Sequence, residues 1–353
     1  MVVLKQGRLR SFGLRRTKEG KESSFPIFLE RRIPEMIKLS NGHQLEFVAA
    51  SGALAFDGRG WPWEWPLRWL GLLDPCLFTI VTKTIMPAPW KGNLQWHAPW
   101  RVVKFLSAQG NVINPVLLLA RPNLLAGAVN AVELTSPGLE TWLKRDYPVI
   151  EQAGYKVIVS VTREKGQSVK EMIRKLNGSK NIVGIEYNAS CPNTDPALFK
   201  DADVVVRNCH EIREVSDYPV LLKLSYVQPY VKISNAVEEI VEAISINSVP
   251  WRVVYPDRES PLTRFGGGGV SGKNAQPFTW RMVSGLSRET KIPVIGPSVW
   301  EWEYEDIQRL KVLGASAFHF GTIFFLSWKP TGYVKRWLRE QQRPNLDGGK
   351  ERC

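Results

Sequence analysis

The chain has 353 residues and a mass of 40.0 kDa, which is enough for one large domain or two ordinary ones. Its composition is globular, with 44% hydrophobic and 23% charged residues, and its four cysteines show neither CxxC nor Cys/His ligand spacing. These numbers argue against a disulfide-rich scaffold, a structural zinc site or a protein-bound iron–sulfur cluster.

The first 44 residues form a basic N-terminal extension to a chain whose formal net charge is +13. A solvated arm is the simplest interpretation, and attraction to a phosphate polymer or an anionic membrane surface stays open. The extension lacks the apolar region of a signal peptide, and the apolar stretch 65–83 is interrupted by Arg68, Asp74 and Pro75. We therefore expect a cytoplasmic protein and leave peripheral membrane contact open, because the Trp-rich stretch 58–69 could pack on the core or form a contact surface.

Residues 45–335 alternate short apolar runs with segments of helical period, and residues 336–353 form a C-terminal tail. Repeated strand–helix units imply parallel strands with right-handed crossovers. Eight such units predict an α/β fold, a closed (β/α)8 TIM barrel with an N-terminal extension and inserted loops; an open doubly wound sheet is the alternative. The expected strands are 46–50, 77–82, 155–161, 182–187, 219–224, 242–247, 292–296 and 316–321, and helical periods occur in 139–154, 170–178, 235–243 and 304–315.

Polar residues interrupt these apolar runs where the expected strands end. In a barrel of this kind the loops after the strands build the active site. The sequence therefore predicts an enzyme whose site includes residues from several strand ends: Lys83, 188–193, Lys223, Asn247, Ser248, Gly321 and Thr322.

The segment 188–194, NASCPNT, places Cys191 between two asparagines on the loop after the fourth expected strand. A lone cysteine is often only a small buried side chain. However, the amides of Asn188 and Asn193 can both donate and accept, which suits the alternating NH and C=O groups of a cyclic amide. A thiol near positive charge can lose its proton and act as a base.

At this segment the chain resembles the dihydroorotate dehydrogenase family, in the form whose base is Cys rather than Ser. The resemblance covers roughly residues 45–330 and recurs in collinear motifs. These motifs are EFVAASGA (46–53), TIVTKT (79–84), GAVNAVELTSPG (127–138), LLKLS (221–225), INSVPW (246–251), GGGGVSGK (266–273) and LGASAFHFGT (313–322).

The resemblance implies bound FMN, with no metal. It implies substrate contacts from Lys83, Asn130, Asn188, Asn193 and Asn247. It also implies cofactor contacts from Ala50, Ser51, Gly52, Lys83, Lys223, Ser248, Ser271, Gly272, Ser298, Gly321 and Thr322.

The resemblance further implies oxidation of (S)-dihydroorotate to orotate in the biosynthesis of pyrimidines and UMP. Cys191 would remove a proton from C5 while a hydride passes from C6 to N5 of FMN. In the family, cysteine accompanies soluble enzymes. The electron acceptor stays open among fumarate, a nicotinamide reached through a separate electron-transfer partner, and a quinone, and so does a homodimer.

Two places depart from the family pattern. The loop 296–306, GPSVWEWEYED, stands where the family has a glycine-rich phosphate loop, and Pro297 has no N–H to offer. Glu133 stands where the family usually has glycine, close to Asn130. We expect phosphate binding to be weaker or rebuilt, and a negative charge near the substrate carboxylate unless Glu133 points away.

Two other functions remain as alternatives. The basic charge favours an FMN barrel that acts on uridine in tRNA, as dihydrouridine synthases do, although INSVPW and the paired asparagines suit a free pyrimidine better. The second alternative is a basic barrel that has lost catalytic activity. Nucleic-acid binding would distinguish the reaction on tRNA from the oxidation of dihydroorotate. We do not expect nucleic-acid binding here.

Overall fold

The structure is a computed structural model that describes residues 36–95, 97–164, 168–190, 201–300 and 304–342. The chain divides into two units, Met1–Arg32 and Ile33–Cys353, and every described residue belongs to the second.

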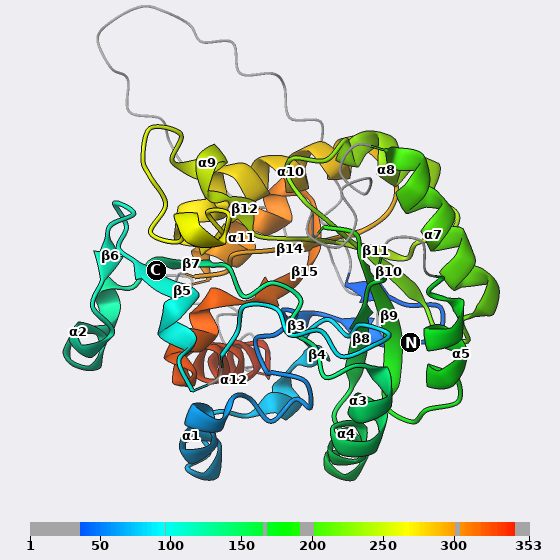
Figure 1. The fold of residues 1–353 in the computed structure, drawn as a ribbon, viewed down its shortest axis with the longest axis horizontal. Coiled ribbons are helices and arrows are strands. Elements are labelled where there is room, and N and C mark those ends of the chain that lie inside the picture. The colour runs from blue at the N-terminus through cyan, green and yellow to red at the C-terminus, as the bar shows by residue number, and fades with distance from the viewer. Residues whose placement is uncertain (1–35, 96, 165–167, 191–200, 301–303, 343–353) are drawn as a thin grey trace, which may run out of the picture. The chain divides into compact units, whose positions relative to one another are not determined.

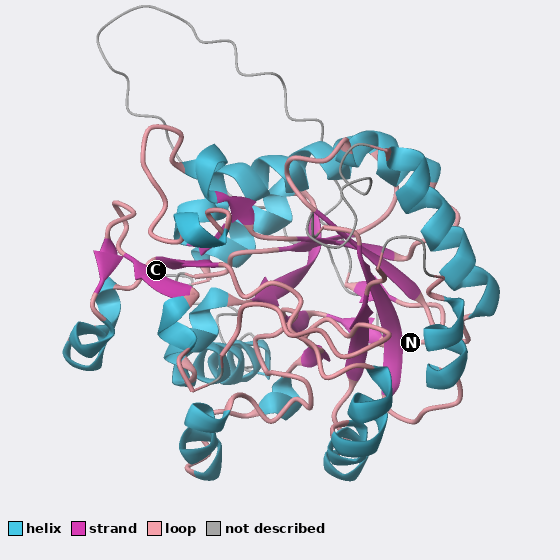
Figure 2. Ribbon diagram, viewed as in Figure 1, coloured by secondary structure: helices cyan, strands magenta, loops and turns pink. Residues whose placement is uncertain are grey.

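Eight parallel strands close into a barrel and follow one another around it in chain order (Figures 1 and 2). Each of the eight expected strands is present, so the predicted TIM barrel is confirmed and the open sheet is wrong. The strands are β3 (Phe47–Ala49), β4 (Thr79–Val81), β8 (Val157–Val161), β9 (Ile182–Asn188), β10 (Val220–Leu224), β11 (Ala243–Ile246), β14 (Val294–Gly296) and β15 (Ala315–Phe320).

Helices surround the barrel in Figure 2, as the apolar stripes of the sequence require. The helices after barrel strands are α3 (Leu139–Arg145), α4 (Tyr147–Ala153), α5 (Lys170–Leu176), α7 (Ala202–Val215), α8 (Tyr230–Ala236), α10 (Gln276–Glu289), α11 (Glu305–Leu313) and α12 (Trp328–Gln342). Three short helices lie in the inserted segments: α1 (Trp65–Trp69), α2 (Pro115–Ala120) and α9 (Trp251–Val254).

The helical expectation for 235–243 was wrong. Helix α8 ends at Ala236, and residues 237–240 form a turn. The apolar side chains that suggested a helix, Val237, Ile240 and Val241, are buried against the main core, while Glu242 N donates to the Val220 carbonyl at 2.8 Å. The apolar spacing here comes from a buried turn that leads the chain back to the sheet. Such a turn can show the same apolar period as a helix.

The barrel interior is filled by layers of side chains, since alternate residues of each strand point inward. One layer is apolar and includes Val48, Ile158, Leu221, Ile295 and Ala317. Two residues further along the strands the inward positions become polar. We call this the polar layer, and its members are Ser160, Glu186, Lys223, Ser245 and His319.

A second sheet lies beside the barrel and was not predicted. Its five antiparallel strands are ordered β12-β13-β7-β5-β6, and β7 pairs with both β13 and β5. This sheet brings segments far apart in the sequence together on one side of the barrel (Figure 1). Its strands are β5 (Val103–Leu106), β6 (Val112–Ile113), β7 (Gly127–Asn130), β12 (Val249–Pro250) and β13 (Gly269–Gly272).

The ends of the described unit pack onto the barrel. Strands β1 (Ile37–Lys38) and β2 (Gln44–Leu45) pair, and Ile37, Leu39 and Leu45 join the apolar layer. The expected boundaries after residues 44 and 335 stay predictions; β2 crosses the first and α12 the second. Within the described part of the chain, no helix combines the length and apolar character needed to cross a bilayer.

Candidate active site

A cavity of about 1210 Å³ lies where the barrel strands end, between the barrel loops and the second sheet. Every predicted site residue that the structure describes lines it, although they come from nine separate stretches of sequence. Cys191 and Asn193 lie outside the described residues. The lining includes Ala50, Ser51, Gly52, Lys83, Asn130, Asn188, Lys223, Asn247, Ser248, Ser271, Gly272, Ser298, Gly321 and Thr322.

Lys83 follows β4 and is almost fully buried, with 6% of its surface exposed. Its Nζ donates to the Glu133 carbonyl at 3.2 Å and lies 5.9 Å from the centre of the Phe56 ring. The Lys83 side chain also packs against Gly52, whose backbone has a φ of +82° that favours glycine. A buried ammonium needs polar partners, so the protein holds this cation in the cavity wall at a fixed place.

Glu133, whose carbonyl accepts from Lys83, also has an unusual backbone conformation. It lines the cavity and has a left-handed φ of +62°. Glycine adopts this conformation without strain, whereas a residue with a Cβ does not. The position where Glu133 replaces the glycine usual in the family is therefore one whose backbone conformation favours glycine.

Asn188 and Asn247 are joined through Ser190, which lies in the predicted segment 188–193 although its role there was missed. The Asn188 side-chain oxygen accepts from Ser190 Oγ at 2.6 Å, and Asn247 Nδ2 reaches the Ser190 carbonyl at 3.5 Å. Asn188 Nδ2 donates to Thr84 Oγ1 at 2.9 Å. Thr84 was also missed; its position directly after Lys83 was the available signal. The amides are thus oriented by neighbours before any ligand binds.

The polar layer supports these amides from below. Thr84 Oγ1 lies 3.1 Å from Ser160 Oγ, which donates to Glu186 Oε1 at 2.9 Å. Ser245 Oγ donates to the other Glu186 oxygen at 2.6 Å. A buried carboxyl group is costly unless it is hydrogen-bonded, and this chain of contacts connects β8, β9 and β11.

The first barrel loop forms another wall. Ser51 Oγ donates to the Thr82 carbonyl at 2.9 Å, and the Trp61 indole donates to the Gly52 carbonyl at 3.0 Å. The Trp61 and Trp63 rings stack with centroids 5.4 Å apart. The Trp-rich insert therefore lines the cavity, as well as exposing Trp69 on α1.

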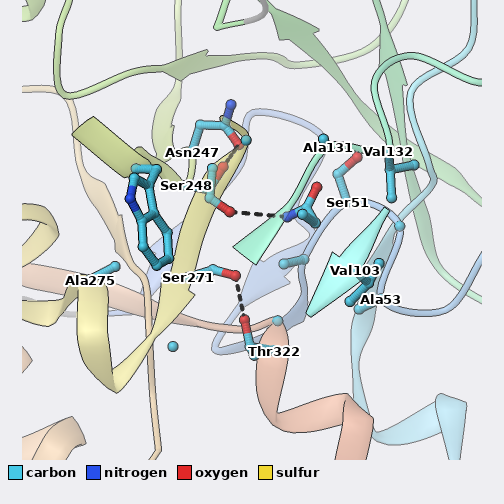
Figure 3. Close-up of a pocket in the computed structure, with 18 of the residues that line it drawn as sticks. Ser51, Ala53, Val103, Ala131, Val132, Asn247, Ser248, Ser271, Ala275 and Thr322 are labelled. Atoms are coloured by element: carbon cyan, nitrogen blue, oxygen red, sulfur yellow. Dashed lines mark hydrogen bonds between the residues drawn. The ribbon is translucent and has the colours of Figure 1, made fainter. Parts of the chain in front are cut away.

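The second sheet and the last barrel loop meet on the other side of the cavity. Thr322 Oγ1 donates to Ser271 Oγ at 2.7 Å, a contact drawn in Figure 3. At Gly272, with a φ of +84°, a Cβ would come within 2.8 Å of the Ala126 carbonyl and of Gly127 Cα. Only glycine fits there, so backbone can reach the cavity surface.

The loop after β14, which differs from the family pattern, is held by hydrogen bonds to side chains of α10 and α11. The Trp300 N–H donates to Asp306 Oδ2 at 2.7 Å, and Gln276 Nε2 donates to Asp306 at 3.0 Å and to the Ser298 carbonyl at 2.9 Å. Ser298 has a φ of +64°. The Trp300 amide is therefore already used within the protein.

His319, a third residue that was missed, lines the cavity from β15. Burial, and then the charge of Lys223, lowers the pKa of His319 to about 3. It lies two residues before Gly321 and three before Thr322, which were predicted to belong to the site, but its own position inside an apolar strand gave no signal. Among the described residues, no group of three His, Cys, Asp or Glu side chains is arranged to hold a metal ion.

Three comparisons relate the chain that forms this cavity to known proteins. The profile of the family described as "Dihydroorotate dehydrogenase" matches residues 114–335. The catalytic subunit of dihydroorotate dehydrogenase B (NAD(+)) of Bacillus pumilus is 30% identical over 208 residues, covering 57% of this chain and 67% of that protein. Its counterpart in Bacillus mycoides is 28% identical over 231 residues, covering 64% and 74%.

The fold comparison agrees. A ligand-free dihydroorotate dehydrogenase from Eimeria tenella superimposes with a TM-score of 0.62 over 89% of both chains, at 16% identity. The structural match establishes the fold, and the family profile covers well over half of the chain. The protein is therefore an enzyme of the dihydroorotate dehydrogenase family of flavin oxidoreductases.

Proposed function

We propose that the protein oxidises (S)-dihydroorotate to orotate, with FMN as its flavin, in pyrimidine biosynthesis. The observation that supports this most directly is the convergence of Lys83, Lys223, Asn188 and Asn247 on one cavity. Cations and amides in this combination suit a flat heterocycle with carbonyl, N–H and carboxylate groups. The two Bacillus relatives carry the same activity in their names.

The residues present fit FMN. The cavity is large enough for a flavin and a small ring together, because ligand pockets typically measure about 300–1,000 Å³ and this one exceeds that range. Lys83 and Lys223 supply positive charge, and Gly272 with Thr322 supplies backbone and hydroxyl groups where an anion could bind. Bound FMN would accept a hydride from C6 of the substrate at N5.

The chain's own residues would then do four things. Cys191 takes the C5 proton; Asn130, Asn188, Asn193 and Asn247 hold the ring and its carboxylate. Lys83 favours negative charge in the cavity. The buried contacts of Asn188 with Thr84 and Ser190 fix its amide, so alignment is set before substrate arrives.

We further propose that electrons leave to a nicotinamide through a separate subunit in the cytoplasm. The support is in the names of the relatives, which are catalytic subunits of NAD(+)-linked enzymes. A homodimer stays a prediction.

The test starts with the visible spectrum of the purified protein. We expect flavin absorbance near about 450 nm, which is a property of flavins generally, and bleaching when dihydroorotate is added without oxygen. Cys191→Ala should keep the colour and lower the bleaching rate by about 10³-fold, within the usual range for a lost acid–base group. Cys191→Ser should retain weak activity that rises at high pH, because a hydroxyl is a poorer base.

Full-rate bleaching by Cys191→Ala would contradict the assigned base. Salt-sensitive tRNA binding, with no bleaching by dihydroorotate, would instead favour the dihydrouridine synthase alternative.

A further inference from the structure

His319 points into the barrel and not toward the surrounding helices. Its neighbours Phe318 and Phe320 belong to the main core, and Phe320 packs edge-on against Tyr333 of α12 at 5.4 Å. Ala317 belongs to the inner apolar layer. Because side chains alternate along a strand, His319 lies on the inner face above Ala317 and reaches the cavity floor.

The imidazole is a member of the polar layer with a buried nitrogen that has no hydrogen-bond partner among the described residues. Ser160, Glu186 and Ser245 are hydrogen-bonded to one another. In contrast, Nε2 of His319 is buried and has no hydrogen-bond partner among the described residues, while the residue is only 4% exposed. Buried polar groups are nearly always paired, so an unpaired one beside a cavity indicates a missing partner.

The chemistry of that partner follows from the neighbouring groups. Burial, and secondly the charge of Lys223, holds the pKa of His319 far below 7, so its ring is neutral at physiological pH. A neutral imidazole has one N–H donor and one acceptor nitrogen, whereas Lys223 can only donate. The partner must therefore accept or donate one hydrogen bond at the imidazole and lie next to an acceptor for a lysine.

The pyrimidine part of a flavin has this pattern, since two carbonyl groups flank an N–H. We propose that Nε2 of His319 hydrogen-bonds the pyrimidine edge of the bound flavin beside Lys223. This contact rests on the proposed function, because it needs a flavin in the cavity. It makes His319 a flavin-binding residue, contributed by the barrel floor and not by the loops.

The test compares FMN binding by the full chain, stripped of flavin, with that of His319→Leu and His319→Gln. Quenching of flavin fluorescence gives the Kd, and apo-protein melting gives the stability. His319→Leu should weaken FMN binding about tenfold, equivalent to one ligand hydrogen bond. The same change should raise the apo Tm by about 2 °C, because it removes an unpaired buried polar group. His319→Gln keeps a donor and an acceptor and should bind within about threefold of the unsubstituted protein.

His43 offers the matched control. Its Nε2 already has a partner, Thr79 Oγ1 at 2.8 Å. It belongs to the segment that packs against the apolar layer, and it does not line the cavity. His43→Gln should leave the FMN affinity unchanged.

Unchanged FMN affinity in His319→Leu would overturn the inference and assign Nε2 to a buried water. Equal losses in the Leu and Gln variants would also overturn it. A protein that binds FMN as described but is not reduced by dihydroorotate would refute the proposed function and leave this contact standing.

Discussion

The two ends of the cavity differ in what their polar groups do. At the end formed by β4, β9 and β11, Lys83, Asn188 and Asn247 line the cavity and are oriented by hydrogen bonds to neighbouring groups. At the end formed by the loop after β14, the polar groups serve the protein: the Trp300 amide and Gln276 are both bonded to Asp306. The first end keeps the family's motif residues, and the second replaces them.

This difference indicates which binding tasks restrict the choice of residue and which do not. Aligning a heterocycle requires donors and acceptors at fixed places, which leaves little choice of residue. Holding the anionic end of a cofactor can be done by many combinations of amides and hydroxyls. With FMN bound as proposed, the Ser271–Thr322 pair and the backbone at Gly272 would provide the anchoring expected of the loop after β14.

Among the substitutions that test this comparison, replacing Lys83 should produce the largest effect on catalysis, because it removes a buried cation from the end where chemistry is proposed. We expect Lys83→Met to lower kcat about 10²-fold, the usual loss for a positioned electrostatic group. Steady-state kinetics with dihydroorotate would measure this. Lys104→Met is the matched control: Lys104 lies on β5 between the cavity-lining Val103 and Phe105 but does not line the cavity itself. Equal losses in both variants would contradict the assigned role.

Glu64 is a buried residue of the cavity lining whose neutral carboxylic acid is favoured over its charged carboxylate. It provides a second test of the comparison. Burial raises the pKa of Glu64 from 4.5 to about 7, although hydrogen bonds from Ser327 and the Trp61 amide partly oppose this. Ser327 Oγ lies 2.6 Å from both Glu64 Oε1 and the Phe324 carbonyl. A protonated Glu64 can therefore donate to Ser327 while Ser327 donates to Phe324.

The sign of the pH effect follows from this raised pKa. Between pH 4.5 and about 7 the folded protein holds a proton on Glu64 that the unfolded chain loses. The stabilisation from Glu64 is therefore complete below pH 4.5, declines as pH rises through 7, and amounts to about 3 kcal/mol. Glu64→Gln, which resembles the neutral acid, should remove this decline. Urea unfolding of both proteins at pH 5 and pH 8 measures it, and parallel pH dependence would refute the assignment.

Asp306→Ala tests the other end through stability. It removes the acceptor of the Trp300 N–H and one of the two acceptors of the Gln276 amide, so we expect the free energy of unfolding to fall by about 2 kcal/mol. Glu305→Ala, one residue earlier on α11, is the control; its exposed contact with Arg309 should be worth less than about 0.5 kcal/mol. Urea denaturation would compare them, and equal effects would show that Asp306 does not organise the loop.

The sequence predicted the barrel well because each strand was a short apolar run bounded by polar or glycine residues. It did not predict the second sheet, whose strands are two to four residues long and whose β7 and β13 pair across more than a hundred positions. Antiparallel pairing between distant short segments leaves no local period to detect. The helical expectation at 235–243 failed for the opposite reason, because a period was present without a helix.

The lining of the cavity was predictable where motifs lay at strand ends, as with Lys83 and Asn247. Residues that act through others were not, because Ser190 and Thr84 become visible only through their contacts with Asn188. His319 is hidden within an apolar strand, and its importance depends on the inward direction of its side chain. Alternation within β15 gave that direction, but nothing in the sequence indicated which face was interior.

Glu133→Gly should give the smallest effect and separates conformational strain from charge at the first end. Glycine adopts the φ of +62° freely, so we expect the free energy of unfolding to rise by about 1 kcal/mol, less the extra entropy of glycine in the unfolded chain. The Lys83 contact uses the backbone carbonyl and should persist. Removing the carboxylate from the cavity wall should also lower KM for an anionic substrate.

Glu171→Gly provides the opposite case, because Glu171 lies in the first turn of α5. Glycine in a helix should lower the free energy of unfolding by about 1 kcal/mol. Urea unfolding should therefore shift in opposite directions for the two Glu→Gly changes. If both destabilise the protein, the left-handed conformation of Glu133 is not a source of strain, and the residue was selected for its charge at the cavity wall.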